Sequence, residues 1–494
     1  MKKLILTLIV IFSAMIMYAE DVLQVVPFKA QPGATSADAC SFSIEMNNAT
    51  ADIWAFQFDI LLPCGMRLDD TDGLEPFELG ERCPYTIGRG GVKNWKHTVQ
   101  YSLLDDGWYR VVVFTTSEDR ISGNSGEVLR AYYLMDDNVK EGIYPIYVRN
   151  SVLTVSGNSD IKPQDSSSYC TVGGLVLDKG GLADFSMLTG YLPSWVVYSI
   201  MDEVDSAEGF TSLDIRNADA FGAEIVLPNL NSLCYVKKGI SSENVVTGNF
   251  VESGDGFYCE KLNLYDGDGD FYSKCDVVCT SASFDREFKA GFWSTVILPF
   301  DIDAEQFDVL SQEGVVVEKL VSYNGNNTLC FEPVEYMQAN VPYIIKCENT
   351  IAPFKDIEIE AFRSTEKNDT ILLDGVSMIG NYGIATLNSD DSRKYYVFDS
   401  QNGEFVLVGK NCKVSPFRAY ISISTETADG NTIRVSHNGR DVTSVEENVN
   451  SLEFSCNVYT TAGVKVREME STLDSVQELG KGVYIIGNKK VVVK

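Results

Sequence analysis

The sequence predicts an all-β, multidomain fold of antiparallel β-sandwiches with a short, degenerate repeat segment between them. The chain has 494 residues, enough for about three or four domains. Hydrophobic residues make up 45% of it, which suffices for a core in each domain. Short runs of alternating polar and apolar residues, bounded by turn residues, fill most of the chain. The run WSTVILPFD at 293–301 is apolar on both sides and is closed by Pro299, as expected of a buried strand.

The charge balance limits the partners. The chain has 70 acidic and 40 basic residues and a formal net charge of −30. A strongly negative surface repels phosphate groups and anionic lipids. We therefore expect neither nucleic acid nor a membrane surface as a partner.

Residues 1–19 carry Lys2 and Lys3 ahead of an apolar run that is too short to span a bilayer. We interpret them as a secretory signal peptide. No second apolar run reaches spanning length, so the mature chain is expected to be exported without membrane insertion. The expected location is extracellular or on the outer cell surface, with the periplasm as the alternative.

Residues 20–173 are predicted to form the first sandwich, because their apolar residues alternate with period two. Trp54 continues a face made of Phe56 and Phe58, so we expect Trp54 in the core. His97 has no nucleophile near it in the sequence. A hydrogen-bonded structural role is expected for it.

Three segments of this region resemble the cohesin-like domains of Bacteroidota surface proteins. They are AFQFDILLPCGM at 55–66, GWYRVVVFTTSEDRISGNSGEVL at 107–129 and EGIYPIYVRNSVL at 141–153. The resemblance implies a β-sandwich of the superfamily that includes carbohydrate-binding modules. It implies a binding role for this part of the chain.

Three aromatic residues of the same region are candidate ligand-binding residues: Trp95, Tyr101 and Trp108. Each sits beside polar or turn residues and is free to be exposed. An exposed flat ring can stack on the face of a sugar, but exposed aromatics also arise at contacts between domains. Both interpretations remain open at this point.

Residues 174–285 are predicted to form the repeat segment. An F-x-x-L-x-I unit at 210–215 recurs at 230–235 and at 259–264. These spacings are typical of leucine-rich repeats, whose short strands bury their apolar side by stacking. Asn217 stands one residue early for the usual asparagine, so we describe the segment as degenerate.

Residues 286–435 are predicted to form a second sandwich. The pieces LPNLNSLCYVKKG, LNLYDGDGDFY and ASFDREFKAGFWSTVILPFDI lie within 227–302, and MQANVPYIIK and SPFRAYISI follow. Together they resemble a module that recurs in leucine-rich-repeat and other surface proteins of Bacteroidota. The resemblance implies a β-rich surface module and no particular chemistry.

Asp266, Asp268 and Asp270 resemble the opening of a calcium loop. Such a loop would next require Gly and Glu where the chain has Phe271 and Val277. Alternating Asp and Gly also suits a tight turn, and we favour the turn.

Twelve cysteines in an exported chain can form disulfides or act as small buried hydrophobes. Cys330 and Cys347 lie on two strands expected to be neighbours, so they form the best candidate disulfide. Cys275 and Cys279 lack the spacing and the histidine partners of a zinc site, and no metal is expected there.

Residues 444–494 form a separate tail. VYTTAGVKV at 458–466 and LGKGVYIIGNKKVVVK at 479–494 resemble the C-terminal sorting tail that the type IX secretion machinery reads. We predict three short strands, the last with an exposed edge on which the machinery could add a strand.

The usual catalytic motifs are absent from the sequence, and His97 and His437 are its only histidines. We therefore expect no enzyme, no cofactor and no metal. The expected function is non-catalytic binding or adhesion at the cell surface, with an extracellular glycan or protein as ligand. A structural role in a surface assembly is one alternative, and a glycosidase with a carboxylate pair is another.

Overall fold

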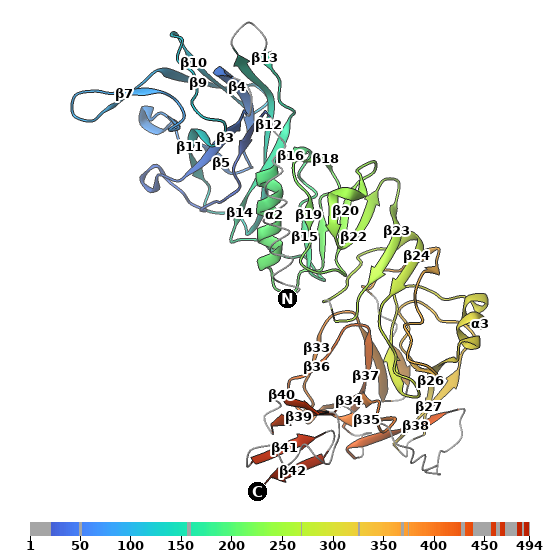
Figure 1. The fold of residues 1–494 in the computed structure, drawn as a ribbon. Helices are drawn as coiled ribbons and strands as arrows, with labels where there is room; N and C mark the ends of the chain where they lie inside the picture. The colour runs from blue at the N-terminus through green and yellow to red at the C-terminus, as the bar shows by residue number, and fades with distance from the viewer. Residues whose placement is uncertain are drawn as a thin grey trace. The chain divides into compact units, whose positions relative to one another are not determined.

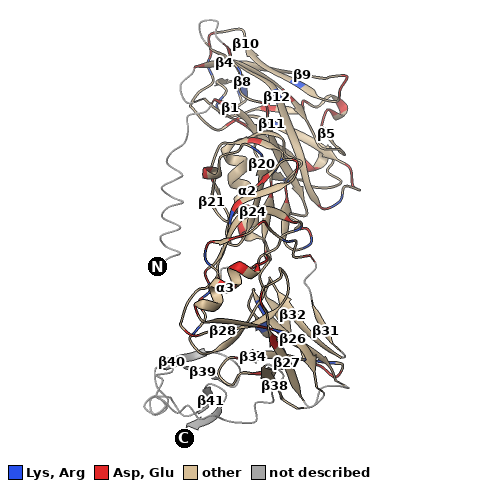
Figure 2. Ribbon diagram, turned by 90° about the vertical axis from the view of Figure 1, so that its right-hand side faces the viewer, with Lys and Arg blue, Asp and Glu red and all other residues tan. Residues whose placement is uncertain are grey.

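The computed structural model describes residues 21–48, 52–155, 160–267, 269–324, 327–366, 370–373, 375–425 and 430–437, and four strands between 456 and 493. The chain divides into two compact units, Met1–Gly439 and Arg440–Lys494. Strands dominate both units, which confirms the predicted all-β class (Figure 1). Acidic residues are spread along the described ribbon and do not gather in one element (Figure 2). The predicted signal at 1–19 lies outside the described residues.

The first sandwich consists of two facing sheets that enclose a common core. In the smaller sheet the strands are β1 (Val22–Val25), β3 (Ser41–Asn47), β11 (Glu127–Met135), β5 (Met66–Leu68) and β6 (Phe77–Leu79). In the larger sheet they are β18 (Ala218–Phe221), β16 (Gly190–Leu192), β14 (Ser166–Val172), β12 (Gly142–Val155), β4 (Ile53–Leu61), β10 (Tyr109–Thr115) and β9 (His97–Leu103), with β13 (Asp160–Ile161) and β2 (Phe28–Lys29) at its sides. A hairpin of β7 (Tyr85–Ile87) and β8 (Lys93–Trp95) stands apart.

The larger sheet does not end at residue 173. Strands β16 and β18 continue it in parallel to β14, whereas strands β12, β4, β10 and β9 are antiparallel. The first sandwich therefore shares a sheet with the beginning of the repeat segment. The exact domain boundary stays a prediction.

The expectation that Trp54 lies in the core was wrong. Strand β12 pairs Thr154 with Ala55 and Val155 with Ile53, so a bulge leaves Trp54 without a partner. Ile53 takes the buried position, and Trp54 is only half-buried, with the Arg120 guanidinium carbon 5.6 Å from its ring centroid.

The repeat segment contains a stack of parallel strands, but its register differs from the prediction. The strands of this sheet are β15 (Leu182–Asp184), β17 (Ser212–Asp214), β20 (Leu233–Lys237), β22 (Asn249–Ser253), β23 (Phe257–Leu264), β24 (Val277–Phe284), β29 (Ile357–Glu358) and β30 (Ala361–Phe362). A small pair, β19 (Ile225–Val226) and β21 (Val245–Thr247), flanks it. Leu213 lies opposite Cys234 and not Leu233, because Leu233 faces a different core. Strand β22 comes between the second and third predicted units, and β23 runs antiparallel to it.

Buried asparagines do occur in this segment, at positions other than Asn217. Asn231 is fully buried and its amide donates to the carbonyls of Tyr265 and Gly269 at 3.1 and 3.0 Å. Asn249 is buried as well and donates to the carbonyl of Asn263 at 3.0 Å. These amides satisfy backbone groups of loops that would otherwise be buried without partners.

Two α-helices occur among the described residues, and the sequence analysis predicted neither. Helix α2 (Ser194–Ser206) buries Val196, Val197, Ile200 and Val204, a helical spacing, against the repeat strands. Helix α3 (Ala304–Gln312) begins with a capping box in which Asp303 accepts from the Gln306 backbone at 2.9 Å.

The second sandwich is one ten-stranded sheet whose two halves pack on a shared core. Its strands, in sheet order, are β25 (Trp293–Val296), β28 (Tyr343–Cys347), β26 (Val315–Tyr323), β27 (Thr328–Pro333), β38 (Thr432–His437), β35 (Glu404–Leu407), β34 (Arg393–Asp399), β37 (Arg418–Ser424), β32 (Val376–Asn381) and β31 (Ile371–Leu373). A side hairpin joins β33 (Ala385–Leu387) to β36 (Cys412–Val414). The WSTVILPFD strand, β25, is the first strand of this order and not a central one. It is nevertheless covered, because the Ala419 amide donates to Thr295 Oγ1 at 3.0 Å.

The predicted disulfide between Cys330 and Cys347 was wrong. Strand β26 lies between their strands, with Cys330 opposite Ser322 and Cys347 opposite Val315. Two strand spacings already separate them by about 10 Å, beyond the Cα distance of about 7 Å that a disulfide tolerates. Both are free thiols.

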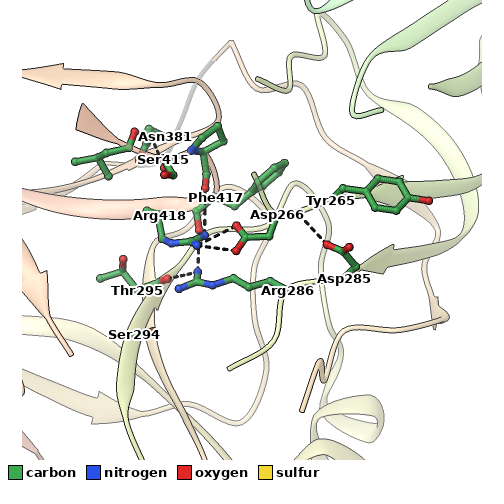
Figure 3. Close-up of polar contacts among 12 residues, drawn as sticks. Tyr265, Asp266, Asp285, Arg286, Ser294, Thr295, Asn381, Ser415, Phe417 and Arg418 are labelled. Carbon is green, nitrogen blue, oxygen red and sulfur yellow. Dashed lines mark hydrogen bonds and ion pairs between the residues drawn. The ribbon is translucent and has the colours of Figure 1, made fainter. Parts of the chain in front are cut away.

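A polar cluster joins the repeat strands to the second sandwich (Figure 3). Arg286 is buried and donates to the Thr295 carbonyl at 2.7 Å, while Arg418 donates to Asp266 at 2.9 Å. Burial, followed by the charge of Arg418, lowers the pKa of Arg286 to about 9. Asp266 is thus held by an arginine.

The aspartate loop supports the turn interpretation. Gly267 and Gly269 have φ of +84° and +109°, which only glycine adopts without strain. Asp270 accepts from the Ile384 backbone at 2.9 Å. Asp268 lies outside the described residues.

The tail contains four described strands and not the three predicted. They are β40 (Lys465–Met469), β39 (Cys456–Thr460), β41 (Gly482–Ile486) and β42 (Lys489–Val493), in this sheet order and all antiparallel. Strand β42 is an edge strand of this sheet, as expected.

Candidate functional site

The outer face of the larger sheet carries a row of charged residues, which we call the arginine row. Arg110 of β10 and Arg149 of β12 lie directly opposite Asp59 of β4, one on each side. Because side chains alternate along a strand, these three point away from the core that Phe58 and Ile60 enter. The row therefore crosses three neighbouring strands.

Asp59 holds the row together. It is only 1% exposed, and its two oxygens accept from Arg110 Nε and Nη2 at 2.7 and 2.9 Å. Asn150 adds a hydrogen bond at 2.9 Å, and Arg149 Nε forms an ion pair at 3.6 Å. Burial alone would raise the pKa of Asp59, but these hydrogen bonds and charges lower it below its ordinary value.

A bulge in β12 places Asn150 and Arg149 around the carboxylate. The register shifts between Arg149 and Val152, and Asn150 adopts a φ of +54°. Asparagine tolerates this left-handed conformation better than most residues. Bulges that redirect side chains in this way are common beside functional sites.

Trp108 lies beneath Arg149. The guanidinium carbon of Arg149 is 3.9 Å from the Trp108 ring centroid, and Arg149 Nη2 donates to Asp106 at 2.5 Å. The β9–β10 turn fixes the tryptophan, because Leu104 accepts from Gly107 and donates to the Trp108 carbonyl. Trp108 is therefore an ordered part of the arginine row.

The row can bind hydrogen-bond acceptors. The Arg110 and Arg149 side chains are 42% and 31% exposed, so both are partly accessible from the solvent. Arginine held in a fixed position recognises carboxylates and carbonyls on another protein. Arginine and tryptophan are also enriched where interfaces gain most of their binding energy.

The other two predicted residues lie in different surroundings. Trp95 stands in the β7–β8 hairpin, 4.9 Å from the Tyr85 ring, with Lys93 Nζ 5.1 Å from its own ring. Tyr101 packs against Phe77 at 5.6 Å and partly joins the core. No ring contact links any two of the three predicted aromatics within the described part of the chain. Their role in ligand binding stays a prediction.

Sequence reasoning found Trp108 but missed its partners. Asp59 stands in AFQFDILL, where a charged residue interrupts an apolar strand. That interruption was a usable signal, since a buried carboxylate needs a partner. The identity of the partners depends on strand register, which the sequence does not provide.

His97 has the structural role expected of it. It is 4% exposed, and its Nε2 lies 2.9 Å from the Trp54 carbonyl oxygen. Burial lowers its pKa, so the ring is neutral near pH 7.

A hollow of about 730 Å³ lies between α3 and residues 350–358 and is lined by several carboxylates. Glycosidase chemistry would require one of them to act as an acid with a raised pKa. Instead, a hydrogen bond from Lys261 lowers the pKa of Asp356. Asp356 therefore does not supply that acid.

A second hollow, of about 340 Å³, lies beside α2. Throughout the described ranges, no group of three or more His, Cys, Asp or Glu side chains is arranged to hold a metal ion. No helix among the described residues is long and apolar enough to cross a membrane.

The solved structures similar to this chain include cohesin modules, whereas no protein-family model and no curated protein matches it. The seventh ScaB type I cohesin from Pseudobacteroides cellulosolvens has 13% identity and a TM-score of 0.24 over 30% of this chain and 90% of that one. A cohesin from Clostridium acetobutylicum has 16% identity and a TM-score of 0.23 over 31% of this chain and 91% of that one. A non-cellulosomal cohesin from Archaeoglobus fulgidus has 9% identity and a TM-score of 0.22 over 31% and 94%. At these values we draw no functional conclusion from the similarity.

Proposed function

We propose that this chain is a non-catalytic binding protein that docks a protein partner on the arginine row. The observation that carries the proposal is the Trp108–Arg149 stack, which the buried carboxylate of Asp59 holds in place. An ordered aromatic–arginine pair loses little conformational entropy on binding, so its contacts contribute efficiently to affinity. The arginine row is therefore already ordered when no partner is bound.

The local charge supports a protein partner. Arg110 and Arg149 balance Asp59 and Asp106, so the arginine row together with Asp106 is neutral within a chain of net charge −30. A partner that offers carboxylates or backbone carbonyls can hydrogen-bond these arginines without meeting a local excess of negative charge.

Export and surface display belong to the same proposal. The signal at 1–19 would direct the chain out of the cytoplasm, and the tail would be read by the secretion machinery. The edge strand β42 offers unpaired backbone groups for strand addition to a receptor.

The test is capture of surface proteins by the immobilised mature chain, compared between two matched arginine variants. Arg149→Glu reverses the charge in the row. Arg120→Glu is the control, because Arg120 also covers a tryptophan, Trp54, and pairs with an aspartate, Asp52, outside the row. We expect Arg149→Glu to reduce retention of a stoichiometric partner at least about 10-fold, and the control to retain it.

Equal retention by both variants would reject the arginine row as the docking site. Stoichiometric envelope complexes that both variants retain would favour the structural role. Release of product from a polysaccharide panel would instead support the glycosidase.

A further inference from the structure

Helix α2 carries the most prominent exposed aromatic pair of the described residues outside the sandwich. Trp195 is 48% exposed and Tyr198 is 40% exposed, and their rings lie 6.3 Å apart at a near-perpendicular angle. The other described tryptophans are partly buried. Two neighbouring exposed rings offer a flat apolar surface on which a ligand can pack.

The same helix face continues into the second hollow. Ser199, Asp202 and Ser206 follow Trp195 at intervals of four, seven and eleven residues, which places all four on one side of the helix. The hollow, of about 340 Å³, is lined by these three residues together with Glu203, Tyr169, Pro27, Phe28 and Lys29. Its size is at the lower end of the range for small-molecule sites.

Tyr169 forms part of the inner wall of the hollow. It is 1% exposed, its ring packs on Phe185 at 5.1 Å, and its phenol oxygen has no hydrogen-bond partner. Burial, followed by the charges of Glu203 and Asp202, raises the pKa of Tyr169. This hydroxyl is shielded from the solvent as well, so a molecule in the hollow would meet the other lining groups and not the phenol oxygen.

The chemistry of the lining selects the ligand class. Asp202 and Glu203 repel phosphate, sulfate and uronic acids, and Lys29 at the same rim repels an ammonium group. A hydroxyl group can donate a hydrogen bond to a carboxylate and accept one from a lysine. A neutral polyhydroxylated molecule can therefore bind both kinds of charged group. An apolar sugar face also fits the flat rings of Trp195 and Tyr198.

We propose that α2 and the neighbouring hollow form a binding site for a neutral oligosaccharide. One sugar ring lies against Trp195 and Tyr198, and the next enters the hollow between Asp202 and Lys29. The span from residue 195 to residue 206 covers about 16 Å of helix. This site is separate from the arginine row, so it can hold whether or not a protein partner docks there.

The experiment is calorimetric titration of the full mature chain with neutral linear hexasaccharides of glucose, xylose, mannose and galactose. We expect at least one to bind. Trp195→Ala should weaken that binding about 10-fold, since stacking and its buried area are lost. Tyr258→Ala is the matched control, because Tyr258 is 39% exposed on strand β23, away from α2, and should leave the affinity unchanged.

Tyr169→Phe is a second control. The phenol has no protein partner and is shielded from the hollow, so its removal should leave the melting temperature unchanged or raise it and should leave the sugar affinity unchanged. Absence of binding by any hexasaccharide at about 1 mM, a weak limit for specific recognition, would overturn the proposal. Binding that is unchanged in Trp195→Ala would overturn it as well, and so would binding of spermidine at this site in place of sugars.

Discussion

Replacing Asp59 by asparagine tests how the arginine row is held. The change keeps the shape of the side chain but removes the charge that accepts two hydrogen bonds from Arg110 at 2.7 and 2.9 Å. A hydrogen bond to a charged group contributes about 1.5–3 kcal/mol. Because the Arg110 side chain is 42% exposed and regains water, we expect the lower part of that range. Asp59→Asn should lower the unfolding free energy of the sandwich by about 2 kcal/mol, or its melting temperature by about 4–8 °C.

The assay is differential scanning calorimetry at pH 7 and at lower pH. Asp106→Asn is the matched control, since Asp106 is 51% exposed and its loss leaves no charge buried. No measurable shift is expected from it.

The pH dependence follows from the direction of the Asp59 pKa. Burial would raise this pKa, but Arg110 and Asn150 lower it in the folded state. The carboxylate therefore stabilises the fold fully above its unfolded pKa of about 3.9, and this contribution is lost as the pH falls through the folded pKa. The difference in unfolding free energy between the wild type and Asp59→Asn must therefore become smaller below that pH. Equal melting temperatures of the wild type and Asp59→Asn at pH 7 would refute this explanation. So would a difference in melting temperature that grows as the pH is lowered.

Three further outcomes are expected. A fragment of residues 21–173 should melt below a fragment of 21–227, because only the longer one keeps β16, β18 and the Phe185 contact of Tyr169; equal melting in calorimetry would contradict this. Deleting 444–494 should leave the melting of the preceding unit unchanged while surface display is lost, as judged by protease accessibility on cells; unchanged display would reject the tail as a sorting signal. Iodoacetamide at pH 8 should label exposed Cys64 first and leave Cys83 unlabelled, since burial raises the pKa of Cys83 to about 12; rapid labelling of Cys83 by mass spectrometry would contradict its burial.

Period-two alternation was enough to predict the β class and the first sandwich, because side-chain direction in a strand is a local property. Pairing is not local. Trp54 leaves the core because of a bulge in the pairing of β4 with β12. Cys330 and Cys347 are apart because β26 pairs between their strands. Both features depend on which strands pair. A single inserted residue reverses the face of every side chain after it.

The two helices could have been found from the sequence. The apolar residues of α2 recur with helical spacing, and Asp303 with Gln306 forms a capping signal. Trp195 on α2 is exposed, whereas the predicted Trp95 and Trp108 are half-buried.

Site-specific photo-crosslinking tests the central claim most directly. A photoreactive residue at Ser102, which is exposed and pairs with Arg110, should crosslink a surface protein on intact cells. The same residue at Glu78, exposed on β6 of the other sheet, should not. Adding Arg149→Glu to the Ser102 probe should abolish the crosslink if the arginine row docks the partner. A crosslink from Glu78 alone, or one from Ser102 that persists with Arg149→Glu, would contradict the account.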